Sequence, residues 1–218
     1  MSEPSVVSVH IGRVAPLGPD REPSAFVKLP VSSPVMVGPL GLAGDEQADL
    51  SVHGGPEKAV YGYAAVHYAA WREEFPQHAD IWGPGAVGEN LAIAGLIEAD
   101  IHVGDVHVIG TAVLQVCQPR QPCHKFALRF GNSRLPKAMV RSGRAGWYYR
   151  VLQPGLIGAG DTVTLRDRPN PDFPFARLVA LVNHGDATAD ELQRMASMPG
   201  LASQWQDEAR EGLRKLKI

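Results

Sequence analysis

The chain contains 218 residues, of which 44% are hydrophobic, 21 are lysine or arginine and 23 are aspartate or glutamate. This length and apolar content permit one main domain together with a small appendage. The net charge of -2 gives no general attraction to nucleic acid or anionic lipid, so an anion-binding site must be a local cluster. No apolar run is long enough to cross a bilayer, and two cysteines without zinc or disulfide spacing suit a reducing compartment. We therefore expect a cytoplasmic protein that binds neither nucleic acid nor membrane.

The first part of the chain predicts short strands joined by turns. Residues 6–11 and 25–29 have strand-like composition, and a loop rich in Pro and Gly separates them. Residues 35–37 lead into a segment of turns that ends near Gly44.

Residues 41–61 concentrate polar groups around a glycine pair. Pro56 suits the first turn of a helix, and we predict a helix over residues 59–75 from its apolar spacing. The free N–H groups at its start, the helix dipole and a lysine would then favour a bound phosphate or other oxyanion. The alternative is a Gly-rich connector with a solvated lysine. The candidate ligands of the oxyanion are His53, Gly54, Gly55 and Lys58.

The next segment predicts β structure. Glu89 and Asn90 could orient a ligand, but the better interpretation from the residues alone is a turn held by the Asn side chain. Residues 101–109 alternate apolar and polar around a Gly-Asp turn, which favours antiparallel strands. His102 and His107 lie in this alternation, and we interpret them as exposed strand residues that bind no metal.

A cysteine loop follows the apolar run 113–117, which predicts a buried strand. Pro119 and Pro122 restrict its backbone. Cations close in sequence to Cys123 would stabilise its thiolate, the form that attacks electrophiles or binds a soft metal. The alternative, a small buried hydrophobe, fits Cys117 well and Cys123 less well. The neighbouring cationic or ionisable side chains are Arg120, His124 and Lys125.

The last third of the chain changes from strands to helices. We predict a helix over 134–141 with Ser133 as N-cap, and strands over 147–152 and 158–165. A Pro-rich linker covers residues 168–174. Thr188 and Glu191 match a capping box for a helix over 189–196. A final helix is indicated by four apolar residues at intervals of four, namely Leu201, Trp205, Ala209 and Leu213.

Five segments together resemble the MOSC family, named for the C-terminal domain of molybdenum-cofactor sulfurase. Within it the chain is similar to the stand-alone bacterial branch linked to resistance to 6-hydroxylaminopurine, whose helical tail it shares. The resemblance covers nearly the whole chain. One departure is His124, where an aromatic residue is expected. The matching segments are 41–47, 53–60, 88–91, 118–125 and 146–152.

This resemblance implies a mainly β fold with some α: an antiparallel β-barrel of the MOSC and pyruvate-kinase-barrel type over residues 1–167, followed by an α-helical module over 168–218. It implies a molybdenum–molybdopterin cofactor, with Cys123 as catalytic residue and metal ligand; pyridoxal phosphate is not expected. Asp45 and Asp49 would shape the substrate side. The implied cofactor-binding residues are His53, Gly54, Gly55, Lys58, Asn90 and Arg120.

The implied activity is reduction of an N-hydroxylated base or amine, such as 6-hydroxylaminopurine, to the amine and water. Electrons would come from an external donor protein, because the chain has no flavin, haem or iron–sulfur signature. The apolar helical tail could support a homodimer. One alternative is a sulfur or molybdenum-cofactor carrier that uses a Cys123 persulfide and reduces no substrate. Another is a non-catalytic β-barrel that binds an anionic metabolite.

Overall fold

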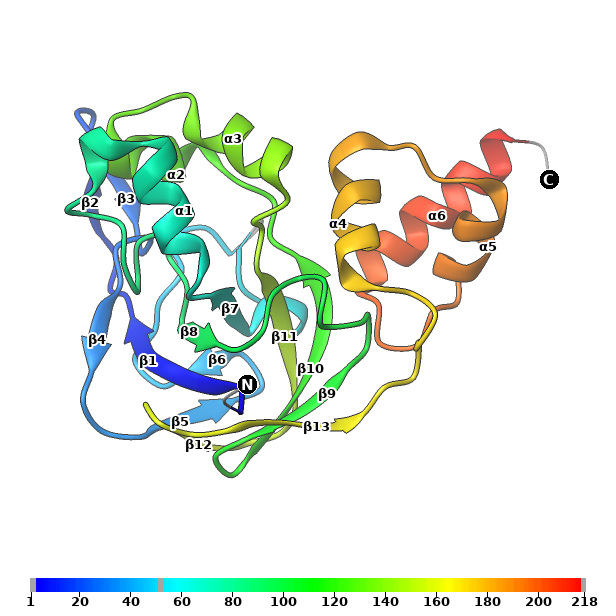
Figure 1. Ribbon diagram of the computed structural model, residues 1–218, viewed down its shortest axis with the longest axis horizontal. Helices are drawn as coiled ribbons and strands as arrows, with labels where there is room; N and C mark the ends of the chain where they lie inside the picture. The colour runs from blue at the N-terminus through cyan, green and yellow to red at the C-terminus, as the bar shows by residue number, and fades with distance from the viewer. Residues whose placement is uncertain (1–2, 51–52, 217–218) are drawn as a thin grey trace.

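The computed structural model describes residues 3–50 and 53–216, which form a curved sheet with helices on its outside (Figure 1). The strands are β1 Ser5–Ile11, β2 Ala15–Leu17, β3 Glu22–Ser24, β4 Leu29–Val31, β5 Val35–Gly38, β6 Gly41–Leu42, β7 Val60–Ala64, β8 Leu91–Ala94, β9 Val106–Ile109, β10 Ala112–Pro119, β11 Trp147–Gln153, β12 Gly155–Ile157 and β13 Val163–Asp167. The helices are α1 His67–Glu74, α2 His124–Phe130, α3 Leu135–Ser142, α4 Phe175–His184, α5 Ala189–Met195 and α6 Ser203–Lys215, with short 3-10 turns at Pro56–Lys58 and Pro76–His78.

The main sheet has eight strands in the order β13-β9-β10-β11-β7-β8-β1-β4. Its neighbouring strands pair antiparallel except β7 and β8, which are parallel. The expected closed barrel is wrong, because β13 and β4 remain edge strands of this sheet. The physical reason is that β4 occupies the second side of β1 from Val9 to Ile11, while β8 pairs with the other side. The end strand β13 and the turn before it therefore reach β1 only at its start, through the bridge between Ser5 and Thr162 and the backbone hydrogen bonds of Pro4 and Val6.

The predicted helix over residues 59–75 is wrong in its first half. Residues 60–64 form β7, and only His67–Glu74 are helical, as α1. All five residues of β7 are buried between β11 and β8. A strand buried on both faces lacks the alternation that distinguishes strand from helix in a sequence. As a consequence, Gly54 and Gly55 precede a single 3-10 turn, and the helix-dipole argument for a phosphate site no longer applies.

Other expectations differ in detail. The predicted strand at 25–29 is found only at Leu29, where β4 begins. Arg134 caps α3 in place of Ser133, without a side-chain hydrogen bond. His107 was expected to be exposed but is buried, with Nδ1 2.8 Å from the Tyr149 hydroxyl, and burial lowers its pKa to about 4. His102 is half-buried and lies outside the named strands.

An aromatic cluster packs beneath α1, α2 and α3. Trp82 stacks on Phe130 with ring centroids 4.2 Å apart, and Phe126 meets both rings edge-on. Both phenylalanines belong to α2, a helix that the sequence reasoning missed. Buried aromatic pairs of this kind add stability beyond their area. The cluster therefore fixes α2, whose N-cap is Cys123.

Helices α4, α5 and α6 follow the linker and lie together beside the sheet (Figure 1). Leu178, Trp205 and Ala209 belong to the same buried core as Leu114 of β10 and Tyr149 of β11. The capping box of Thr188 and Glu191 is confirmed, whereas a domain boundary at residue 168 stays a prediction. Within the ranges that the structure describes, no helix is long and apolar enough to cross a membrane.

Substituting Glu191→Gln is expected to destabilise the protein by about 1 kcal/mol, the usual value of a capping interaction. The Glu191 carboxylate accepts two hydrogen bonds from Arg177 of α4, at 2.7 and 3.0 Å, and one from the Thr188 N–H at 2.9 Å. These contacts, of which the one with Arg177 is the strongest, lower the pKa of Glu191 to about 2. The stabilisation is therefore present above the ordinary glutamate pKa and is lost as the pH falls from there toward 2.

Urea denaturation of the wild type and Glu191→Gln at neutral pH and at pH 3 measures this difference. The matched control is Glu208→Gln in α6, which should change stability by less than about 0.5 kcal/mol. A stability difference that grows as the pH falls would contradict the assignment.

Candidate functional site

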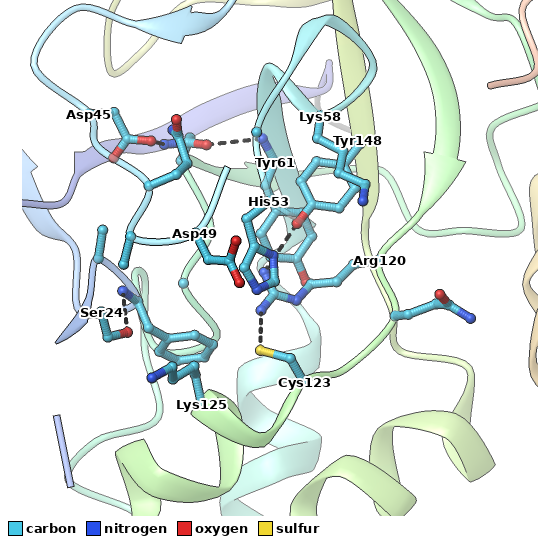
Figure 2. Close-up of a pocket in the computed structure, with 18 of the residues that line it drawn as sticks. Ser24, Asp45, Asp49, His53, Lys58, Tyr61, Arg120, Cys123, Lys125 and Tyr148 are labelled. Atoms are coloured by element: carbon cyan, nitrogen blue, oxygen red, sulfur yellow. Dashed lines mark hydrogen bonds between the residues drawn. The ribbon is translucent and has the colours of Figure 1, made fainter. Parts of the chain in front are cut away.

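One cleft of about 860 Å³ gathers nearly all of the predicted site residues (Figure 2). Its walls come from the β3–β4 connection, the loop before β7, the end of β10 and the cysteine loop, with Gln204 of α6 at the margin. Gly55 is the exception among the predicted residues, because it does not line the cleft. The predicted residues that do line it are Asp45, Asp49, His53, Gly54, Lys58, Asn90, Arg120 and Cys123.

Cys123 is a half-buried thiol at the point where β10 has ended and α2 begins. Burial alone would raise its pKa. A hydrogen bond with the His53 side chain and the positive charge of Arg120 outweigh burial and lower the pKa of Cys123 to about 6. The thiolate is thus the main form at neutral pH, as nucleophiles and soft metal ligands require.

Cys117 behaves in the opposite way, as the sequence predicts. It is fully buried in β10 and donates to the Glu57 and Tyr148 carbonyl oxygens at 3.1 and 3.4 Å. Burial raises the pKa of its thiol to about 12. Cys117 is therefore an inert core residue and a useful control for Cys123.

Arg120 provides a buried positive charge beside the thiol (Figure 2). Its guanidinium lies over the Tyr61 ring at 4.9 Å and donates to Cys123 Sγ over 3.8 Å. A weaker contact of 3.4 Å reaches the Tyr148 hydroxyl. Within the described ranges, no carboxylate lies within ion-pairing distance of Arg120. The Cys123 thiolate, 3.8 Å away, is its anionic neighbour; because a buried charge without a close ion pair is costly, this arrangement favours a further anionic ligand in the cleft.

The glycine loop supplies further cationic and backbone groups. Gly54 and Gly55 have φ angles of 81° and 83°, which other residues rarely adopt. A Cβ at Gly54 would meet the Gln47 side chain at 3.1 Å, whereas a Cβ at Gly55 would meet open space. The pKa of Lys58 is lowered, first by burial and then by repulsion from Arg120. Two cations that repel each other across a cleft would both be stabilised by an anion between them.

A second buried group, missed by the sequence reasoning, is the ion pair between Lys28 and Asp45. Both side chains are less than a tenth exposed, and Asp45 also accepts from the Gly12 N–H at 2.7 Å and from the Asn90 amide at 3.0 Å. Burial lowers the pKa of Lys28, partly offset by Asp45. The second N–H of the Asn90 amide donates to the His10 carbonyl, so the side chain has no donor left for a ligand. Its main effect is to hold Asp45 in place.

Glu57 and Gln118 connect the helical tail to the cleft. The Glu57 carboxylate accepts from the Ser203 N–H and hydroxyl at the start of α6, and from Arg150 of β11 at 2.6 Å. Gln118 donates to the Glu57 carbonyl at 2.8 Å and accepts from the Trp205 indole at 3.2 Å. The loop that carries Lys58 and the strand that leads to Cys123 are therefore both fastened to α6.

His124, where the family resemblance predicts an aromatic residue, lines the cleft with a side chain that is mostly exposed. Its side chain is 64% exposed and lies 2.8 Å from Glu22 of β3. Lys125 contacts the same carboxylate at 2.5 Å. The substitution therefore leaves the thiol and the guanidinium in place and ties the cysteine loop to the β2–β3 hairpin.

The donor set fits one particular class of ligand. In the described part of the chain, no group of three His, Cys, Asp or Glu side chains could enclose a metal ion. A single soft thiolate beside several cations instead suits an anionic organic cofactor that brings its metal with it and takes one protein ligand. These features are the ionised Cys123, the buried guanidinium of Arg120 and the positive-φ backbone at Gly54.

Comparisons with known proteins identify the family of the chain. Residues 49–164 match the family model described as the MOSC domain. The chain is 37% identical over 199 residues to protein YiiM of Escherichia coli, covering 91% of this chain and 88% of the relative. It is 37% identical to a protein named reductase from Gibberella moniliformis, covering 88% of this chain but 34% of that longer protein. The crystal structure of YiiM from Geobacillus stearothermophilus superposes with a TM-score of 0.81 at 33% identity, covering 96% of this chain and 99% of that one.

Proposed function

The chain belongs to the MOSC family, and we propose that it binds a molybdenum–pterin cofactor in the cleft and reduces N-hydroxylated bases or amines to amines. The observation that carries the proposal is the ionised Cys123 thiol beside the buried guanidinium of Arg120, which has no carboxylate partner in the described part of the chain. The thiolate is a suitable ligand for a soft metal, and the guanidinium is a suitable donor to a phosphate. The relative named reductase supports an oxidoreductase activity.

Each side chain has a defined part in this proposal. Cys123 would ligate the metal, while Arg120, Lys58 and His53 would hold the phosphate and the pterin. The N–H of Gly54 can approach the ligand closely because a glycine has no side chain. The rings of Phe26 and Tyr61 lie against the Arg120 guanidinium at 5.4 and 4.9 Å and keep water from it. A drier guanidinium binds an anion more strongly.

The reaction converts R–NH–OH, two electrons and two protons into R–NH₂ and water, with cleavage of the N–O bond. The bound cofactor would supply the two-electron chemistry. Lys28 is a candidate source of one proton, because burial lowers the pKa of its ammonium group in the cleft wall. Asp45 would keep that ammonium in position. The electrons come from a partner protein in this proposal, which leaves the chain itself to bind, orient and protonate the substrate.

A sulfur or cofactor carrier is the second candidate, because a half-buried thiol of low pKa can also hold a persulfide. The deciding experiment uses protein made in a host that synthesises the cofactor and in a host that does not. We expect molybdenum, pterin and conversion of 6-hydroxylaminopurine to adenine with the first protein only, when a chemical reductant supplies electrons. Cofactor without turnover would favour the carrier.

A further inference from the structure

The basic residues of this chain are distributed unevenly. All 23 acidic residues lie outside residues 106–160, which carry eight of the 21 lysines and arginines. This stretch contains the cysteine loop and helices α2 and α3. The near-neutral net charge of the whole chain therefore conceals a basic stretch next to the cleft. The eight residues are Arg120, Lys125, Arg129, Arg134, Lys137, Arg141, Arg144 and Arg150.

Half of these cations have partners within the fold or belong to the cleft. Arg120 lies in the cleft, Lys125 pairs with Glu22, Arg150 pairs with Glu57 at 2.6 Å, and Arg144 pairs with Glu74 at 3.1 Å. These contacts explain their positions without a further ligand.

Of the remaining four cations, Arg129 belongs to α2, and the other three gather on the outer side of α3. Arg134, Lys137 and Arg141 follow one another at intervals of three and four residues, which places them on one face of the helix. All three side chains are exposed. Arg141 touches Glu74 and is still 75% exposed, and no carboxylate of the described residues lies within ion-pairing distance of Arg134 or Lys137. We refer to Arg134, Lys137 and Arg141 as the α3 cationic face.

A shallow groove of about 450 Å³ connects the α3 cationic face to the cysteine loop. Its lining includes Lys137, Arg141, His184 at the end of α4, and Pro122. Pro122 also lines the main cleft, and the next residue is Cys123. A protein docked in this groove would contact Pro122, whose Cα atom is about 3.8 Å from that of Cys123, because this is the spacing of consecutive Cα atoms.

We propose that the α3 cationic face docks an acidic redox protein that delivers the electrons for substrate reduction. This inference rests on the proposed function, whose reaction consumes two electrons and two protons for each N–O bond cleaved. The partner is oxidised as the R–NH–OH nitrogen is reduced, and the oxygen leaves as water. Complementary charge steers two proteins together and sets their orientation, mainly through the association rate. Nucleic acid is a poorer fit, since three cations beside a partly apolar groove make a small phosphate-binding surface.

The test compares two electron sources with the cofactor-loaded protein. Reduced flavodoxin and a [2Fe–2S] ferredoxin serve as acidic donor proteins, and dithionite-reduced methyl viologen is a small donor that needs no docking surface. The double variant Arg134→Glu/Lys137→Glu reverses the two cations of the α3 cationic face that have no carboxylate partner among the described residues. Its matched control is Arg166→Glu, an exposed reversal in β13, far from α3 in Figure 1.

We expect the double variant to lose about tenfold in kcat/KM for the better protein donor at low salt, chiefly through KM, while methyl viologen supports the wild-type rate. Added salt should slow the wild type and affect the variant little. The inference is overturned if the double variant and Arg166→Glu give the same kcat/KM with the protein donor, or if the double variant loses activity equally with both electron sources. It is also overturned if methyl viologen supports turnover while neither acidic protein does. Loss of binding to a duplex oligonucleotide at 150 mM salt would assign the face to nucleic acid instead. Absence of turnover with methyl viologen refutes the proposed function itself.

Discussion

Cys123→Ser is expected to retain less than about a tenth of the molybdenum and pterin of the wild type when both are made in a cofactor-producing host. Loss of a supporting side chain near a metal already costs tenfold or more in affinity, and loss of the ligand itself should cost at least as much. A serine hydroxyl stays protonated at neutral pH and is a hard donor, whereas the thiolate of Cys123 is ionised and soft. Metal analysis and fluorescence of the oxidised pterin give the result directly.

The matched control is Cys117→Ser, which changes the other thiol of the chain. A serine there can still donate to the Glu57 carbonyl, so we expect full cofactor content. Equal metal in wild type and Cys123→Ser would remove Cys123 from the metal. If neither protein holds metal, and mass spectrometry finds one additional sulfur atom on Cys123, the carrier function replaces the reductase.

The chemistry of the cysteine loop was predictable because its determinants are local. Pro119 and Pro122 restrict the backbone, and Arg120 lies three residues from Cys123, so sequence proximity translates into spatial proximity. The same applies to the capping box of Thr188 and Glu191, which depends on four consecutive residues. Local patterns therefore identified both the thiol and the start of α5.

Residues that meet across the sheet were not predictable in this way. Lys28 and Asp45 form a buried pair although 17 positions separate them, and a lysine in a strand-like segment carries no signal of such a partner. The β7 strand was mistaken for helix because all five of its residues are buried. That mistake also hid Tyr61 as a platform for Arg120. These features depend on which residues become buried in the folded chain, and the hydrophobic periodicity of the sequence does not reveal this.

The connection between the tail and the cleft was also invisible in the sequence. The predicted helix around Trp205 is present as α6. The hydrogen bond between Trp205 and Gln118, however, joins two residues that are 87 positions apart in the sequence. The tail had been interpreted as an appendage that could support a dimer. Its hydrogen bonds to Glu57 and Gln118 instead connect it to the loop that carries Lys58 and to strand β10, which leads to Cys123, whatever the oligomeric state.

The thiol of the cofactor-free protein is expected to titrate near pH 6, and the variants Arg120→Met and His53→Phe should each raise that pKa by about one to two units. Burial raises the pKa of Cys123, and the contacts with His53 and Arg120, together with the Lys125 N–H, bring it down to about 6. When either contact is removed, the effect of burial dominates and the pKa of Cys123 rises. The wild-type thiolate therefore predominates at neutral pH and disappears below pH 6, whereas the variant thiols remain largely protonated at neutral pH.

Thiolate absorbance near 240 nm between pH 4 and 9 measures this titration. Cys117 does not contribute, because the pKa of its thiol is about 12. Arg120→Lys is the conservative control, since it keeps the positive charge without the planar guanidinium and should leave most of the depression in place. Circular dichroism of each variant separates a changed pKa from a changed fold. A pKa near 6 in both folded variants would mean that neither side chain stabilises the thiolate, and it would remove the electrostatic basis for Cys123 as a metal ligand.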